Sequence, residues 1–127
     1  MSGYTLCIPG LPPSTNNAFV NLRSGGRALS REASLWKAGV GLAVACSRPP
    51  EIIGQVEVTL TFYSENWLTK KGKSRKVDLA NFEKLFVDAV FKGLGVDDSE
   101  IFRLVMHKKI GPDSSVIVVR ELAEVAS

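Results

Sequence analysis

The spacing of apolar residues changes its period once in the second half of the chain, and this change strongly constrains the fold. Residues 55–64 alternate apolar and polar side chains, as a half-buried strand does. From Asp78 onward the apolar residues instead recur at helical spacing on one face. A strand and a helix that each have one apolar side pack those sides together, which predicts layered α/β structure. The residues expected to be buried are Val56, Val58, Leu60 and Phe62 in the strand, and Phe82, Leu85, Phe86 and Ala89 in the helix.

Four more elements are expected from local signals. Residues 4–8 are predicted to form a short strand, and the Ser/Asn/Gly-rich stretch 14–29 a long ordered or semi-ordered loop of the kind that is functional or mobile. Ser30 is a candidate N-cap for a helix to about Ser47. Residues 101–109 and 115–121 are expected to be strands joined by a turn. The helix after Ser30 has Glu32 in its first turn and is expected to bury Leu35, Trp36, Val40 and Val44, and the turn between the last strands contains Gly111, Pro112 and Asp113.

The resulting order is strand, helix, strand, helix, strand, strand. It predicts an α/β fold with a mixed sheet, helices packed on it, and antiparallel pairing in the final hairpin. Gly93 and Gly95 are expected to end the second helix. The length of 127 residues fits one small domain, residues 1–127.

Composition narrows the class of protein. The longest apolar runs fall short of the roughly 18 to 20 residues that span a bilayer, and the first residues lack the pattern of a secretory signal, so we expect a cytoplasmic protein without a membrane partner. Cys7 and Cys46 have no metal-ligand spacing, which makes zinc unexpected and predicts buried, reduced thiols.

The charges are segregated along the chain. Residues 70–76 read KKGKSRK, whereas acidic residues gather between 78 and 100. This asymmetry, more than the net charge of +3, is the footprint of a protein that binds nucleic acid. Trp67 precedes the basic run and is expected either to stack on an unpaired base or to pack in the core. His107 is interpreted as a surface or phosphate-contacting residue. The candidate DNA-binding residues are Lys70, Lys71, Lys73, Arg75, Lys76 and Asn81.

Carboxylates flank the predicted second helix. Asp78 lies at its start, and Asp97 and Asp98 follow the glycines at its end. If the chain folds back, Asp78 and Asp98 could converge on one Mg²⁺, which prefers oxygen ligands and keeps several waters. Each residue also has an ordinary interpretation: Asp78 as a helix cap, and the Asp97-Asp98 pair as a turn. Asp88 is expected to form an i,i+4 pair with Lys84.

The segment VDLANFEKLFVDAVFKGLGVDDSEI, residues 77–101, closely resembles the signature of the RusA family of Holliday-junction endodeoxyribonucleases. That signature has the form D-x-D-N-x-x-K, then a helix containing D-A, then G and D-D. The segment IPGLPPSTNN, residues 8–17, is similar to the family's Pro-Pro-Ser-Asn-Asn segment. The resemblance therefore extends over most of the chain.

The resemblance implies roles for individual residues. Asp78 matches the first catalytic aspartate, Lys84 the catalytic lysine, and Asp98 a third essential carboxylate with Asp97 beside it. Asn81 matches the conserved asparagine of the motif. The family's second aspartate is replaced by Ala80, so the resemblance implies metal ligation by Asp78, Asp98 and Asp97 with one ligand missing.

The function implied is Mg²⁺-dependent cleavage of four-way junctions and related branched DNA by a homodimer, in bacterial or phage-infected cytoplasm. Two alternatives remain open. Ala80 also fits a junction-binding protein that does not cleave, either natural or an inactivated form of an enzyme; retention of the other motif positions favours the latter. A nuclease acting on RNA or on flaps is the third interpretation.

Overall fold

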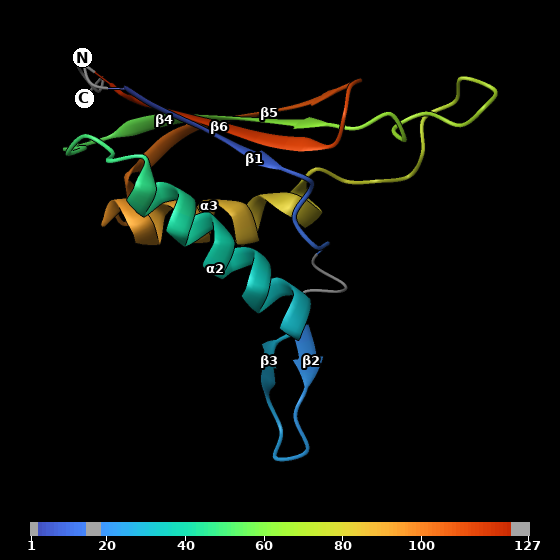
Figure 1. Ribbon diagram of the computed structural model, residues 1–127, viewed down its shortest axis with the longest axis horizontal. Coiled ribbons are helices and arrows are strands. Elements are labelled where there is room, and N and C mark those ends of the chain that lie inside the picture. The colour runs from blue at the N-terminus through green and yellow to red at the C-terminus, as the bar shows by residue number, and fades with distance from the viewer. Residues whose placement is uncertain (1–2, 15–18, 123–127) are drawn as a thin grey trace.

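The computed structural model describes residues 3–14 and 19–122, and it has a sheet with two helices packed on one face (Figure 1). Thr15, Asn16 and Asn17 of the Pro-Pro-Ser-Asn-Asn segment lie outside the described residues. The sheet has four strands in the order β1-β6-β4-β5. The β4–β5 pair is parallel, and the β1–β6 and β4–β6 pairs are antiparallel. The strands are β1 (Gly3–Pro9), β4 (Val56–Tyr63), β5 (Ile101–Lys109) and β6 (Ser114–Glu121). The predicted α/β class is confirmed.

Two helices cover the sheet. Helix α2 (Arg31–Cys46) begins after Ser30, whose hydroxyl accepts a hydrogen bond from the Ala33 amide at 3.1 Å, as expected for an N-cap. Helix α3 (Ala80–Leu94) connects the parallel strands β4 and β5. It begins two residues later than predicted and ends at Gly95, which has a left-handed φ of 71°.

The core lies between the sheet and the two helices. The predicted inner faces of β4 and α3 are both buried. Phe62 and Phe86 meet with ring centroids 6.0 Å apart, and Trp36 packs edge-on against Phe86. Leu35, expected to be buried, is instead 63% exposed, because it lies on the outer side of α2 beyond the reach of the sheet.

The final two strands do not form the predicted hairpin. Strand β4 lies between β5 and β6, so β5 pairs in parallel with β4 at the sheet edge and β6 pairs with β1 on its other side. Local sequence specified the two strands and their turn but not this insertion, because β4 is contributed from elsewhere in the chain. The edge position of β5 leaves one of its sides free of strand partners within the described residues.

A short hairpin replaces most of the predicted loop 14–29. Strands β2 (Phe19–Asn21) and β3 (Arg27–Leu29) pair antiparallel and project from the body (Figure 1). The turn between them contains Gly25 and Gly26 with φ of 88° and 81°, a conformation that glycine adopts at little cost. Leu29 anchors the hairpin base against the cluster of Ala33 and Leu85.

Both cysteines are free and exposed, so the expectation of buried thiols is wrong. Cys7 lies on the outward-facing side of β1, whose burial alternates along the strand. Cys46 is the last residue of α2 and faces away from the core. Neither helix in the described part of the chain is long and apolar enough to cross a membrane.

Candidate active site

Lys84 lies between two carboxylates that come from different elements. Its Nζ is 3.3 Å from Asp88 Oδ1 on the same helix and 3.5 Å from Asp98 Oδ2 beyond the helix end. The Asp88 contact is the predicted i,i+4 pair. The Asp98 contact shows that the chain folds back after α3, so the structure brings together two of the four predicted catalytic positions.

A short helical turn orients Asp98. The 3₁₀ turn η1 (Asp98–Glu100) leads directly into β5, and Asp97 is its N-cap. The Asp97 carboxylate accepts a hydrogen bond from the Ser99 amide at 2.8 Å. Asp97 is thereby engaged in the turn, while Asp98 faces α3 and Lys84.

Three side chains in and beside this cluster, Glu83, Lys84 and Asp97, have pKa values shifted from their usual values. The hydrogen bond and charge of Asp88, with a smaller contribution from Asp98, raise the pKa of Lys84 above its usual value, so the ammonium is retained. Partial burial raises the pKa of Glu83, opposed by Lys84 and reinforced by the charges of Asp88 and Asp98. The hydrogen bonds from Ser99 lower the pKa of Asp97. A permanent cation thus sits among several carboxylates.

An open hollow of about 360 Å³ lies between α3 and β5, and it is bordered by Glu83, Lys84, Asp88 and Asp98. Of its nine lining residues in the described part of the chain, the sequence singled out only Lys84, Asp88 and Asp98. Phe102, 56% exposed, falls at a register shift where β5 pairs with β4 as Val56–Ile101 and then Glu57–Arg103. Such a β-bulge changes the direction in which neighbouring side chains point, and the sequence of a single strand does not reveal it. The lining residues are Glu83, Lys84, Val87, Asp88, Asp98, Ile101, Phe102, Arg103 and Leu104.

The remaining predicted site residues lie at the start of α3. Asp78 is exposed and precedes the helix, and its carbonyl accepts a hydrogen bond from the Asn81 amide at 3.0 Å. It is not the helix cap, because Leu79 occupies that position without a side-chain hydrogen bond. Ala80 is the first helical residue and is exposed. Neither Asp78 nor Ala80 borders the hollow around Lys84.

The family resemblance implies a divalent cation, and the donor atoms available suit one in type. Asp78, Asp97 and Asp98 offer carboxylate oxygens, the ligands that Mg²⁺ prefers. In the part of the chain that the structure describes, however, no three His, Cys, Asp or Glu side chains gather closely enough to hold a metal. Ala80, where the resemblance implies a further carboxylate, offers no oxygen from its side chain.

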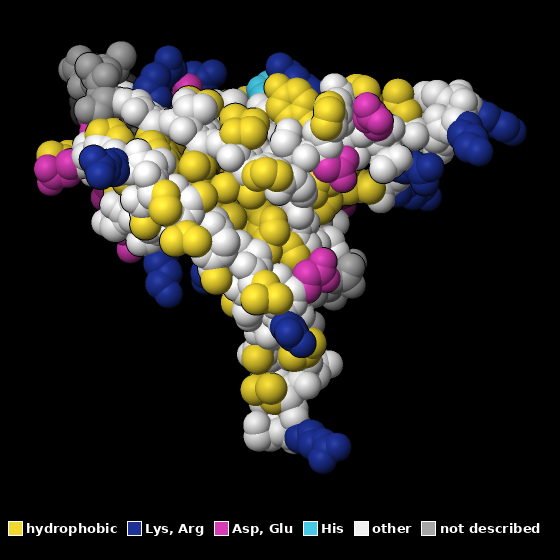
Figure 2. All heavy atoms as spheres, in the orientation of Figure 1, with side chains coloured by type: hydrophobic (Ala, Val, Ile, Leu, Met, Phe, Trp, Pro, Cys, Tyr) yellow, Lys and Arg dark blue, Asp and Glu magenta, His cyan; other side chains and the backbone are white. Residues whose placement is uncertain are grey.

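The basic run lies on an extension that projects away from the body and leads back into the start of α3 (Figure 1). After β4 the chain extends away from the sheet and returns to α3, and Figure 2 shows lysine and arginine side chains at the tip of this extension. A bridge between Leu68 and Ser74 and a turn at Gly72, with φ of 79°, give it a hairpin-like shape. Its five cations are exposed and form no ion pair within the described residues: Lys70, Lys71, Lys73, Arg75 and Lys76.

Trp67 anchors the base of this extension in the core. Its indole Nε1 donates to the carbonyl oxygens of Lys109 at 2.9 Å and Phe62 at 3.2 Å, and only 6% of the residue is exposed. Of the two interpretations of Trp67, core packing is therefore the one that the structure supports. Lys108 Nζ lies 5.4 Å from the ring centroid. His107 is exposed, as predicted.

An ammonium between two carboxylates, an open hollow and a cationic extension that leads into the same helix suit a phosphate-bearing polyanion. The family model described as Endodeoxyribonuclease RusA matches residues 9–120. The chain belongs to the RusA family of endodeoxyribonucleases, which are Holliday-junction resolvases. A search of the curated proteins finds no match to this chain.

Proposed function

We propose that this chain is a structure-specific nuclease of four-way DNA junctions whose cleavage is impaired by Ala80. The observation that carries the proposal is the 3.5 Å contact between Lys84 and Asp98, which joins two motif positions 14 residues apart. The basic run of residues 70–76 leads into the helix that carries Lys84. Family membership supports the substrate class.

Lys84 is proposed to stabilise the negative charge that develops on the oxygens of the cleaved phosphate. A cation already held in place by Asp88 and Asp98 needs little reorganisation during the reaction, which is the main source of such stabilisation. The five cations of residues 70–76 would hold the flanking backbone and offset repulsion between substrate phosphates and the aspartates. Asn81, at the start of α3, would contact the same DNA.

Mg²⁺ is proposed as the cofactor, and Asp78 and Asp98, with Asp97 beside them, would hold it. When bound it would polarise the phosphate and lower the pKa of a coordinated water. Ala80 leaves this set one carboxylate short of the family pattern.

A homodimer is proposed because resolution of a junction needs two cuts in strands of like polarity, and a two-fold pair of sites supplies them. We also propose that residues 1–127 are one nuclease domain and that it acts in the cytoplasm of a bacterial or phage-infected cell.

The test is Ala80→Asp, incubated with a synthetic four-way junction and Mg²⁺. Paired nicks in strands of like polarity are expected, with little cleavage by the chain as it stands. Ala80→Asn is the matched control, since it adds a side chain of nearly the same shape without the charge. If Ala80→Asp produces no paired nicks while it binds the junction, the proposed resolvase activity is wrong.

Ala80 itself favours a second candidate, a protein that binds and protects or distorts branched DNA without cutting it. This candidate predicts tight junction binding by the chain as it stands and no cleavage even after Ala80→Asp. Competition among junction, flap, duplex and RNA separates both candidates from a nuclease of RNA or flaps, because only the latter would prefer those substrates.

A further inference from the structure

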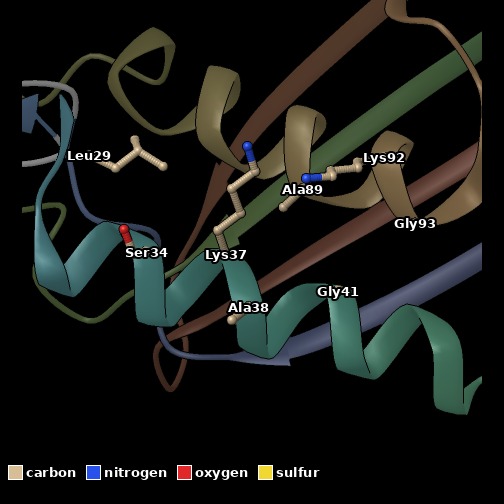
Figure 3. A pocket seen from close by; sticks show the side chains of 8 residues that line it. All are labelled: Leu29, Ser34, Lys37, Ala38, Gly41, Ala89, Lys92 and Gly93. Carbon is tan, nitrogen blue, oxygen red and sulfur yellow. The ribbon is translucent and has the colours of Figure 1, made fainter. Parts of the chain in front are cut away.

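A second basic surface lies between α2 and α3, apart from the hollow around Lys84. It is an open groove of about 530 Å³ whose floor is formed by small residues, with Leu29 and Ser34 at one end. Lys37 projects from α2 and Lys92 from α3, and both reach over the same groove (Figure 3). The small residues of the groove are Ala38, Gly41, Ala89 and Gly93.

The two lysines have no counter-charge of their own. Neither forms an ion pair with any carboxylate in the described residues. Lys37 is half-buried and Lys92 is exposed. Their aliphatic stems therefore lie along the groove while their ammonium groups stay at the surface. Two ammonium groups that converge without a carboxylate between them create a positive potential that an anion would relieve.

The groove and the candidate active site both lie along helix α3, although they share no lining residue among those that the structure describes. Lys84, Asp88 and Lys92 follow each other at intervals of four residues, so they form one stripe along α3. Eight residues of helix separate the two lysines by about 12 Å along the axis. One DNA strand rises that far in about three to four steps of 3.4 Å. A single strand could therefore cross both sites.

Other features of the groove agree with a backbone ligand. Its floor lacks large side chains, which leaves room for a sugar-phosphate chain to approach the two helices. The Ser34 hydroxyl offers a further hydrogen-bond donor at the same edge.

We propose that Lys37 and Lys92 form a second DNA-contact surface, which binds backbone phosphates of the same substrate a few nucleotides from the phosphate at Lys84. This inference rests on the proposed function, because it assigns a further contact for that DNA. The surface supplies affinity and orientation, and it is separate from the cations of residues 70–76.

The test compares salt dependence of junction binding without metal. Lys37→Gln with Lys92→Gln should reduce the slope of log affinity against log salt by about 1.8 units, from 0.9 per lost phosphate contact. Its affinity deficit should then grow about 3.5-fold for each halving of the salt concentration. The change should add to that of Lys73→Gln with Lys76→Gln, because the two surfaces touch different phosphates.

The charge-matched control is Arg48→Asn with Arg120→Gln. Arg48 lies after α2 with a φ of 50°, which asparagine tolerates, and Arg120 pairs with Glu57 on the sheet. This control removes the same charge away from the groove and should leave the slope unchanged. If Lys37→Gln with Lys92→Gln has the slope of this control, the groove does not bind DNA and the inference fails.

Two further measurements test whether the groove instead binds a mononucleotide or a second copy of the chain. Titration with a deoxynucleoside monophosphate, followed by NMR, would overturn the inference if it saturates the groove resonances while the DNA slope stays unchanged. Sedimentation would overturn it if the lysine changes alter self-association and not the slope. Failure of the unsubstituted chain to bind any junction would instead refute the proposed function, and this inference with it.

Discussion

Lys84 and Asp98 meet across the end of α3, with Nζ 3.5 Å from Oδ2 although 14 residues separate them in the chain. The contact depends on the Gly95 helix end and on the η1 turn that returns the chain toward α3. Both side chains remain well exposed, 65% for Lys84 and 52% for Asp98, so the pair contributes little to stability. We therefore regard the position of the lysine as serving the site more than the fold.

Lys84→Ala in the Ala80→Asp background should reduce cleavage by about 100-fold or more, because it removes a preorganised cation from the developing charge. Junction affinity should change much less, since the contact strengthens only in the transition state. Single-turnover cleavage and a binding titration on the same junction measure the two effects. Equal losses in rate and affinity would make Lys84 a binding residue.

Asp88→Asn in the same background is the matched control. It neutralises the nearer partner of Lys84 but leaves the Asp98 contact available, so its effect on cleavage should be clearly smaller. A loss of cleavage as large as that of Lys84→Ala would show that Asp88 takes part in the reaction itself and does not only support Lys84.

Lys73→Glu with Lys76→Glu should weaken DNA binding without unfolding the protein. Both lysines are exposed and unpaired within the described residues, and such side chains add little to stability. Each lost phosphate contact should lower the slope of log affinity against log salt by about one unit. An unchanged slope in a fluorescence titration, with an unchanged thermal midpoint, would show that the extension is a solvated tether.

Glu83→Gln should change how stability depends on pH. Burial raises the folded-state pKa of Glu83 above 4.5, so the folded protein binds more protons than the unfolded chain just above that pH. The contribution of Glu83 to stability therefore falls as pH rises from 4.5 through its folded-state pKa. Relative to wild type, Glu83→Gln should gain stability from pH 4 to pH 7 in metal-free urea unfolding. A constant difference across this range would contradict the assigned shift.

Local sequence patterns predicted the helices and the longer strands well, but they did not predict which strands pair. The alternation in 55–64 and the helical spacing after Asp78 report which face is buried, which depends on one element at a time. The separation of β5 and β6 by β4 depends on three segments at once. The hairpin around Gly25 was also missed, because its strands of three residues are too short to show a period.

The residues of the candidate site were likewise predicted only where local sequence or the motif was enough. Spacing placed Lys84 and Asp88 on one helical stripe, and the motif added Asp98, which the structure brings to 3.5 Å from Lys84. Phe102 was not predicted, because it reaches the hollow through a register shift between two strands. The role of Asp78 stays a prediction.

Two helical glycines should respond oppositely to alanine. A Cβ at Gly39 in α2 would meet no atom within 4 Å, so Gly39→Ala should stabilise the protein by about 0.5 to 1 kcal/mol through helix propensity. A Cβ at Gly93 in α3 would lie 2.8 Å from Val44 Cγ1, and Val44 is fully buried and stiff. Gly93→Ala should therefore destabilise, since overpacking costs about 1 to 3 kcal/mol.

The double change Gly93→Ala with Val44→Ala isolates the cause of that loss. Val44→Ala alone leaves a cavity and destabilises, but it also removes the methyl group that a Cβ at position 93 would strike. In that background Gly93→Ala should become neutral or stabilising, with a coupling free energy of about 1 kcal/mol or more in a double-mutant cycle from urea unfolding. Additive losses would show that α2 and α3 can separate at this point, and that the close approach of Gly93 to Val44 does not fix their packing.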